Sequence, residues 1–81
     1  MEDKYRDFFL ELAQVFKKHQ VTAPFGSRLS INWVENDRVI GTYRIVEIWI
    51  DREGEAVLRV KEECSGGFKQ EFEIYSDGKV G

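Results

Sequence analysis

The stretch from Arg38 to Ile50 constrains the fold of this chain more than any other segment. It is rich in β-branched and aromatic residues and contains no proline, which is typical of a strand. It is also much longer than an average strand, which has about five or six residues. We therefore expect one long strand over residues 38–50, and the segments after Pro24 can be placed by pairing them against it.

The length and composition of the chain favour one folded domain. With 81 residues, 42% of them hydrophobic and a single proline, the chain can bury one modest core. A net charge of −3 disfavours non-specific binding to nucleic acid. The single cysteine, Cys64, excludes an internal disulfide and a multi-cysteine metal site. No signal-peptide core or membrane-length apolar run is present, so we expect a cytoplasmic protein without membrane association.

The first segment has the pattern of an amphipathic helix over about residues 3–20. Its apolar residues recur three or four positions apart and form one stripe. The stripe could lie on a membrane or a partner helix, but the polar face is mixed in charge, which favours packing on the chain's own sheet. The stripe consists of Tyr5, Phe8, Phe9, Leu12 and Phe16, with His19 at its end and with Ala13 and Val15 widening it.

Pro24 and Gly26 end the helix and begin a connection to the first strand. Residues 29–35 alternate between apolar and polar side chains, as in a half-buried strand. Asn36 and Asp37 suit a two-residue hairpin loop because both tolerate positive φ. With that loop, strict alternation predicts the pairs Glu35–Arg38, Trp33–Ile40, Ile31–Thr42 and Leu29–Arg44.

Two later turns set the register of the remaining strands, expected at about residues 55–64 and 68–76. The segments 51–55 and 64–68 each have the form of a three-residue loop with glycine at the left-handed position. The resulting register places apolar residues on one face and opposite charges on the other, and a one-residue slip would destroy both patterns. The apolar pairs are Ile48–Leu58, Val46–Val60, Leu58–Ile74 and Val60–Phe72; the other face pairs Trp49–Val57–Tyr75, Glu47–Arg59–Glu73, Lys61–Glu71 and Glu63–Lys69.

These elements predict an α+β fold in which one N-terminal helix packs on a curved four-stranded antiparallel meander in the order 1-2-3-4. Gly41 is a candidate for a bulge or bend, and residues 77–81 are expected to be a loose tail. The outline is similar to the helix-gripped sheets of cystatin- and monellin-like proteins. The chain carries no sequence motif of either family, so the similarity concerns architecture alone.

The sequence contains no recognisable catalytic, metal or cofactor motif. His19 is the only histidine and lies in the last helical turn, where it serves most often as a cap. Cys64 follows Glu62 and Glu63, and neighbouring carboxylates make a thiol less reactive. We therefore expect a protein that is not an enzyme and has no cofactor.

A row of polar residues is predicted at one end of the face that the helix covers. In the strict register Arg44 faces Glu62, and Gln70 faces Glu62 from the other side. Buried groups of this kind must satisfy one another. The row is either a solvated rim beyond the helix or the mouth of a small ligand pocket, formed by Thr42, Arg44, Glu62 and Gln70.

An apolar patch is predicted on the opposite, outer face of the sheet. Exposed aromatic area of this extent is unusual for a solitary monomer, and Trp and Tyr are enriched at binding hot spots. The alternatives are scattered surface residues or a tail that folds over them. The patch consists of Tyr43, Ile45, Trp49, Val57 and Tyr75.

The leading interpretation is a small protein-binding module, either an accessory or inhibitor-type protein or a homodimer, that uses this outer face. The alternative is a small-ligand-binding domain built on the polar row. Nucleic-acid binding through Arg59 and Lys61 is a weaker alternative, because Glu47, Glu71 and Glu73 neutralise that strip.

Overall fold

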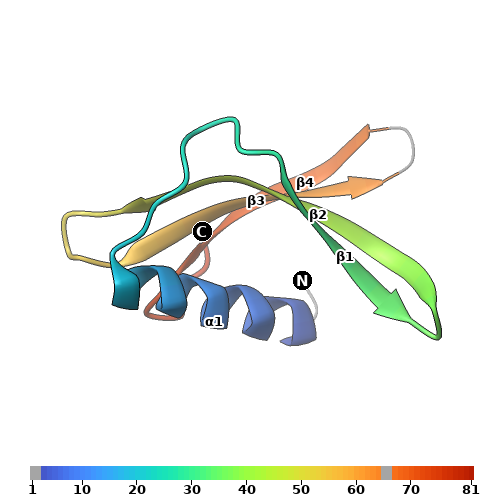
Figure 1. The fold of residues 1–81 in the computed structure, drawn as a ribbon, viewed down its shortest axis with the longest axis horizontal. Coiled ribbons are helices and arrows are strands. Elements are labelled where there is room, and N and C mark those ends of the chain that lie inside the picture. The colour runs from blue at the N-terminus through green and yellow to red at the C-terminus, as the bar shows by residue number, and fades with distance from the viewer. Residues whose placement is uncertain (1–2, 65–66) are drawn as a thin grey trace.

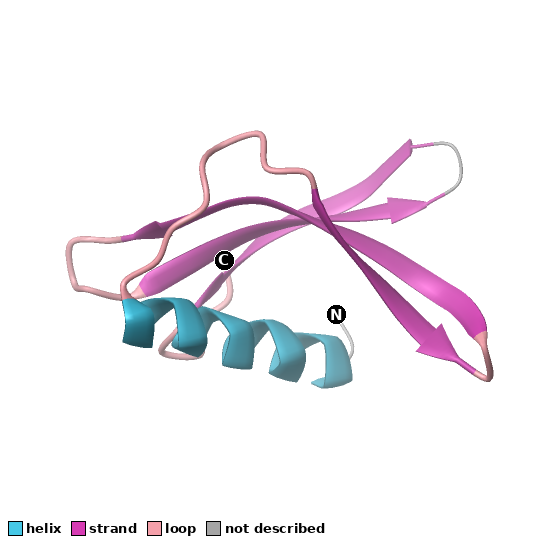
Figure 2. Ribbon diagram, in the orientation of Figure 1, coloured by secondary structure: helices cyan, strands magenta, loops and turns pink. Residues whose placement is uncertain are grey.

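The computed structural model describes residues 3–64 and 67–81 of the chain. The elements follow in the order α1 (Asp3–His19), β1 (Leu29–Glu35), β2 (Arg38–Ile50), β3 (Ala56–Cys64) and β4 (Gly67–Tyr75). The four strands form one antiparallel sheet in the order β1-β2-β3-β4, and α1 lies along one face of it (Figures 1 and 2). The α+β class and the strand order predicted from the sequence are therefore confirmed.

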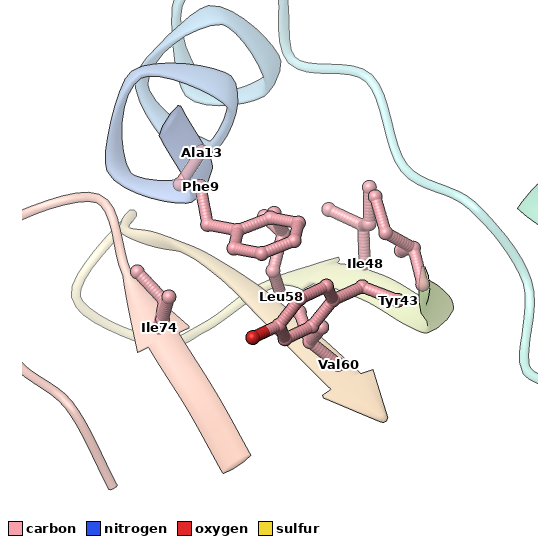
Figure 3. Packing of buried hydrophobic residues seen from close by; sticks show 8 residues of the cluster. Phe9, Ala13, Tyr43, Ile48, Leu58, Val60 and Ile74 are labelled. Carbon is pink, nitrogen blue, oxygen red and sulfur yellow. The ribbon is translucent and has the colours of Figure 1, made fainter. Parts of the chain in front are cut away.

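The helix packs on the sheet through the apolar stripe that its periodicity predicts. Phe9 and Ala13 are fully buried, and α1 lies over β3 and β4. Figure 3 shows the Phe9 ring above Leu58 and Tyr43, at the centre of the core. No helix in the described part of the chain is long and apolar enough to cross a membrane.

The turns that set the register have the expected geometry. Asn36 and Asp37 have φ of 52° and 62°, as a two-residue loop requires. Gly54 has a φ of 84°, and the Asp51 N–H donates to the Glu55 carbonyl at 2.8 Å across the second loop. The third expected loop includes residues 65 and 66, which lie outside the described residues; at its margin Cys64 pairs with Gly67 and not with Phe68.

Two β-bulges in β2 break the strict alternation that the sequence suggests. Trp33 pairs with Gly41, so Ile40 is an extra residue and the expected Trp33–Ile40 pair is wrong. Val60 pairs with Ile45, so Val46 is a second extra residue and the expected Val46–Val60 pair is wrong. Because each extra residue shifts the alternation by one, the part of β2 between the two bulges presents its side chains to the opposite faces.

The bulges change the remaining expected pairs of β1 as well. Ile31 pairs with Tyr43 in place of Thr42, and Leu29 pairs with Ile45 in place of Arg44. A third irregularity, in β4, makes Phe68 and not Lys69 the partner of Glu63. The other predicted pairs between β3 and β4 are confirmed, including Val60–Phe72, Leu58–Ile74, Lys61–Glu71, Arg59–Glu73 and Val57–Tyr75.

Two segments outside the four strands, the connection after α1 and the C-terminal residues, form backbone hydrogen bonds with edges of the sheet. Ala23 and Ile48 exchange backbone hydrogen bonds of 3.0 Å, and the Val46 carbonyl accepts from the N–H groups of Gly26 and Ser27. The expectation of a loose tail is also wrong: Gly81 exchanges hydrogen bonds with Glu73 of β4, and Lys79 accepts from the Tyr75 N–H. The connection after α1 thus extends the sheet beside β2, and the C-terminal residues extend it beside β4.

Candidate protein-binding surface

The outer face of the sheet is the face turned away from α1 (Figure 1). Alternation along each strand and the observed register determine which residues lie on it. They form three rows across the central strands: Trp49, Val57 and Tyr75; Glu47, Arg59 and Glu73; and Arg44, Lys61 and Glu71.

The first row is the apolar part of this face. Val57 is only 1% exposed although no helix covers it, and it lies between Trp49 and Tyr75, which are both partly exposed. Burial of its ring and the neighbouring Glu73 carboxylate raise the pKa of the Tyr75 phenol. The phenol is neutral at physiological pH, and its hydroxyl donates to Glu73 Oε1 at 3.4 Å.

Arg59 links the apolar row to the charged rows. Its guanidinium carbon lies 5.2 Å from the centre of the Trp49 ring, a cation–π arrangement. Its Nη2 donates to Glu73 Oε2 at 3.1 Å, and its other nitrogens lie 3.6 Å from Glu71 and 3.8 Å from Glu47. The predicted row of Glu47, Arg59 and Glu73 is confirmed, and these carboxylates compensate the positive charge of Arg59.

Two residues of the predicted patch do not lie on the outer face. Tyr43 is 2% exposed and Ile45 is fully buried, and both belong to the core under α1; Figure 3 shows Tyr43 there, below the Phe9 ring. The Tyr43 ring lies 5.4 Å from the rings of Tyr5 and Phe9. The Val46 bulge causes this reversal, because it shifts the alternation of β2 on its N-terminal side. The apolar patch on the outer face is therefore limited to Trp49, Val57 and Tyr75.

The same bulge separates the polar residues predicted to line a ligand pocket. Arg44 pairs with Lys61 on the outer face and forms an ion pair with Glu63 at 2.8 Å, so the expected Arg44–Glu62 contact is wrong. Thr42 lies on the outer face too, where its hydroxyl donates to Asn32 Oδ1 at 3.0 Å.

Glu62 and Gln70 remain together on the inner face, as expected. Gln70 Nε2 donates to Glu62 Oε1 at 2.6 Å. The four polar residues therefore form two separate groups on opposite faces and do not line a common pocket.

The remaining candidate chemistry is sparse. His19 is exposed at the end of α1. Among the described residues, no three His, Cys, Asp or Glu side chains are grouped as a metal site would require.

Further apolar residues are exposed on the β1 side of the sheet, in β1, at the start of β2 and in the connection before β1. They do not share one face: Leu29 alternates with Ile31 and Trp33 on the side of α1, whereas Val34 and Val39, which the sequence places near the outer patch, pair with each other on the outer side. Figure 1 shows that the β1–β2 hairpin extends past the N-terminal end of α1. Its sequence signal is the run of β-branched residues on both sides of the Asn36-Asp37 turn. The exposed residues are Phe25, Leu29, Val34, Val39 and Ile40.

Comparison with known proteins adds no family to this description. No protein-family model matches the chain, and no curated protein or solved structure is significantly similar to it.

Proposed function

We propose that this chain is a small non-enzymatic protein-binding module, of the accessory or inhibitor type or acting as a homodimer, and that its contact surface is the outer sheet face around Trp49. The observation that carries the proposal is the position of Trp49, partly exposed on a face that α1 does not cover and stacked with Arg59. Trp, Tyr and Arg are the residues most enriched at binding hot spots, and this site contains all three.

The distribution of charge around Trp49 supports the same function. The row next to the apolar row contains Glu47, Arg59 and Glu73, and the following row adds Arg44, Lys61 and Glu71, so charges of both signs continue along the face from Trp49. An apolar centre with a polar rim of both signs is typical of a protein–protein interface. Nucleic acid is disfavoured as a partner, because Arg59 already faces three carboxylates within 4 Å and a phosphate would have to displace them.

The test compares two substitutions of aromatic residues. Trp49→Ala should weaken retention of a partner, or self-association, by about thirtyfold, which corresponds to roughly 2 kcal/mol. Phe25→Ala is the matched control, because Phe25 is 72% exposed and lies in the connection before β1, outside the strands that carry Trp49, Val57 and Tyr75. This control should leave binding unchanged.

Quantitative pull-down from native lysate measures the binding of a different protein, and sedimentation equilibrium measures self-association. Equal loss of binding in both variants would indicate a non-specific effect of aromatic surface. Unchanged binding in Trp49→Ala would exclude the outer face as the contact surface. Circular dichroism of both variants confirms that the fold is retained.

A further inference from the structure

The free edge of β1 has no lysine, no proline and no bulge of its own, and the one charged residue of the strand is Glu35 at its end. β1 is the first strand of the sheet and has only β2 beside it. Its sequence from Leu29 to Val34 contains no lysine, proline or charged residue, and the bulge in the β1–β2 pair lies in β2. Natural edge strands usually carry such features because an unprotected edge is a template for another strand.

Other stretches of edge in the same sheet are covered by the chain itself. The connection after α1 is hydrogen-bonded to β2 at Val46 and Ile48, and the C-terminal residues are hydrogen-bonded to β4 at Glu73 and Tyr75. Within the described residues, none of these additional backbone hydrogen bonds reaches β1. The β1 edge is therefore a place where the chain can accept one more strand.

The hairpin turn determines which backbone groups this edge offers. Glu35 and Arg38 close a two-residue loop, so they exchange both backbone hydrogen bonds. Because β1 itself has no extra residue, its backbone N–H and C=O groups point alternately toward β2 and away from it, counting back from Glu35. The N–H and C=O groups of Ser30, Asn32 and Val34 then point away from β2.

We propose that β1 pairs antiparallel with β1 of a second copy of this chain, about a two-fold axis at Asn32. In this register Asn32 lies opposite Asn32 of the other copy, and Ser30 lies opposite Val34. Every residue with outward backbone groups thus meets another such residue, which is the self-complementarity that an isologous interface requires. In the same register Ile31 lies opposite Trp33 of the other copy and Leu29 lies opposite Glu35, so no like charges meet along the pair.

The pairing would bury apolar surface that the monomer exposes. Val34 is 63% exposed and would lie opposite Ser30 of the other copy, while Leu29 is 46% exposed and would lie opposite Glu35. The two sheets would join into one continuous sheet of eight strands, and both outer faces would lie on the same side. This dimer does not use Trp49, so it is independent of the function proposed above.

The test uses two substitutions at one position. Asn32→Pro removes the outward N–H and places a ring against the partner strand. Because the N–H of Asn32 points away from β2, no hydrogen bond within the sheet is lost, and an edge strand tolerates proline at such a position. Asn32→Ala is the matched control: it also loses the side-chain contact with Thr42 but keeps the N–H. Sedimentation equilibrium should show a dimer for the parent and for Asn32→Ala. Asn32→Pro should raise the dissociation constant at least about tenfold, because two symmetry-related hydrogen bonds are lost.

Should Asn32→Pro fail to fold, Val34→Lys provides a second variant, since its side chain is exposed and a lysine blocks edge pairing. It should also dissociate the dimer. A parent protein that stays monomeric up to about 1 mM would overturn the proposal. So would a dimer that survives both substitutions, or one that is lost only in Trp49→Ala.

Discussion

Replacing two isoleucines in the same strand, Ile45 and Ile40, by alanine tests the bulges of β2 directly. Strict alternation from the hairpin turn places Ile40 toward the helix and Ile45 outside. The structure reverses both: Ile45 is 0% exposed and Ile40 is 46% exposed. The two substitutions remove the same atoms from the same strand, so their difference reports on position alone.

The expected magnitudes differ enough to be measured. Ile45→Ala removes buried methyl groups from the core and should cost about 2 to 5 kcal/mol in the free energy of unfolding. Ile40→Ala loses some strand propensity at an exposed position, which should cost less than about 1 kcal/mol. A domain of this length has a total stability of roughly 4 to 12 kcal/mol, so Ile45→Ala could remove half of it or more.

Urea titration followed by circular dichroism is the measurement, with the slope of the transition checked for each variant. If Ile45→Ala does not fold, the pair Ile45→Val and Ile40→Val gives the same comparison, with an expected cost of about 0.5 to 1.5 kcal/mol for the buried position. A larger loss for Ile40 than for Ile45 would refute the bulged register and restore the apolar patch to the outer face.

Two further predictions concern the network that joins the end of α1 to the start of β3. Ser76 is buried, and its hydroxyl accepts from the Ala56 N–H at 2.9 Å. Ser76→Ala leaves that donor without an acceptor and should lower the free energy of unfolding, measured by urea titration, by about 1 to 3 kcal/mol. Glu55 accepts from Lys17 and from Ser76, at 2.7 Å each, and these hydrogen bonds lower the pKa of its carboxyl group. Its contribution to stability is therefore present above the unfolded-state pKa of about 4.3 and is lost as the pH falls through the lower, folded-state value. Thermal unfolding between about pH 6 and pH 3 should give a lower melting temperature for Glu55→Gln than for the parent at pH 6, and the two melting temperatures should converge toward pH 3. A difference in melting temperature that does not change with pH would contradict this linkage.

The parts of the fold closest to the turns were predictable from the sequence. Register propagates from a turn by counting residues, so the two-residue loop at Asn36 and Asp37 and the glycine loop at Gly54 gave correct pairs near themselves. The errors in β2 begin at its two extra residues, Ile40, three residues after the first loop, and Val46, near the middle of the strand. Val46 reverses every assignment on its N-terminal side until Ile40 compensates it.

The Val46 bulge depends on a tertiary contact that cannot be predicted from the pattern of each strand alone. At this point β2 changes its neighbour from β1 to the connection after α1, and the Val46 carbonyl accepts two N–H groups from that connection. The sequence does carry a trace of the change. Polar residues occupy positions 42 and 44 but then 47, so the alternation shifts by one between Arg44 and Glu47.

The helix explains why the bulged register is the favourable one. The N-terminal half of α1 presents Tyr5 and Phe9 to the sheet, and these rings need apolar partners. Without the bulge they would face Arg44 and, across the strand pair, Glu62; burying such an ion pair under aromatic rings costs desolvation free energy that the attraction between the two charges often does not repay. With the bulge they face Tyr43, at 5.4 Å from each ring, while Arg44 reaches Glu63 on the outer face. The helix therefore requires Tyr43, one of the two aromatic residues of β2 that suggest a binding patch, and Trp49, beyond the bulge, is the one that remains on the outer face.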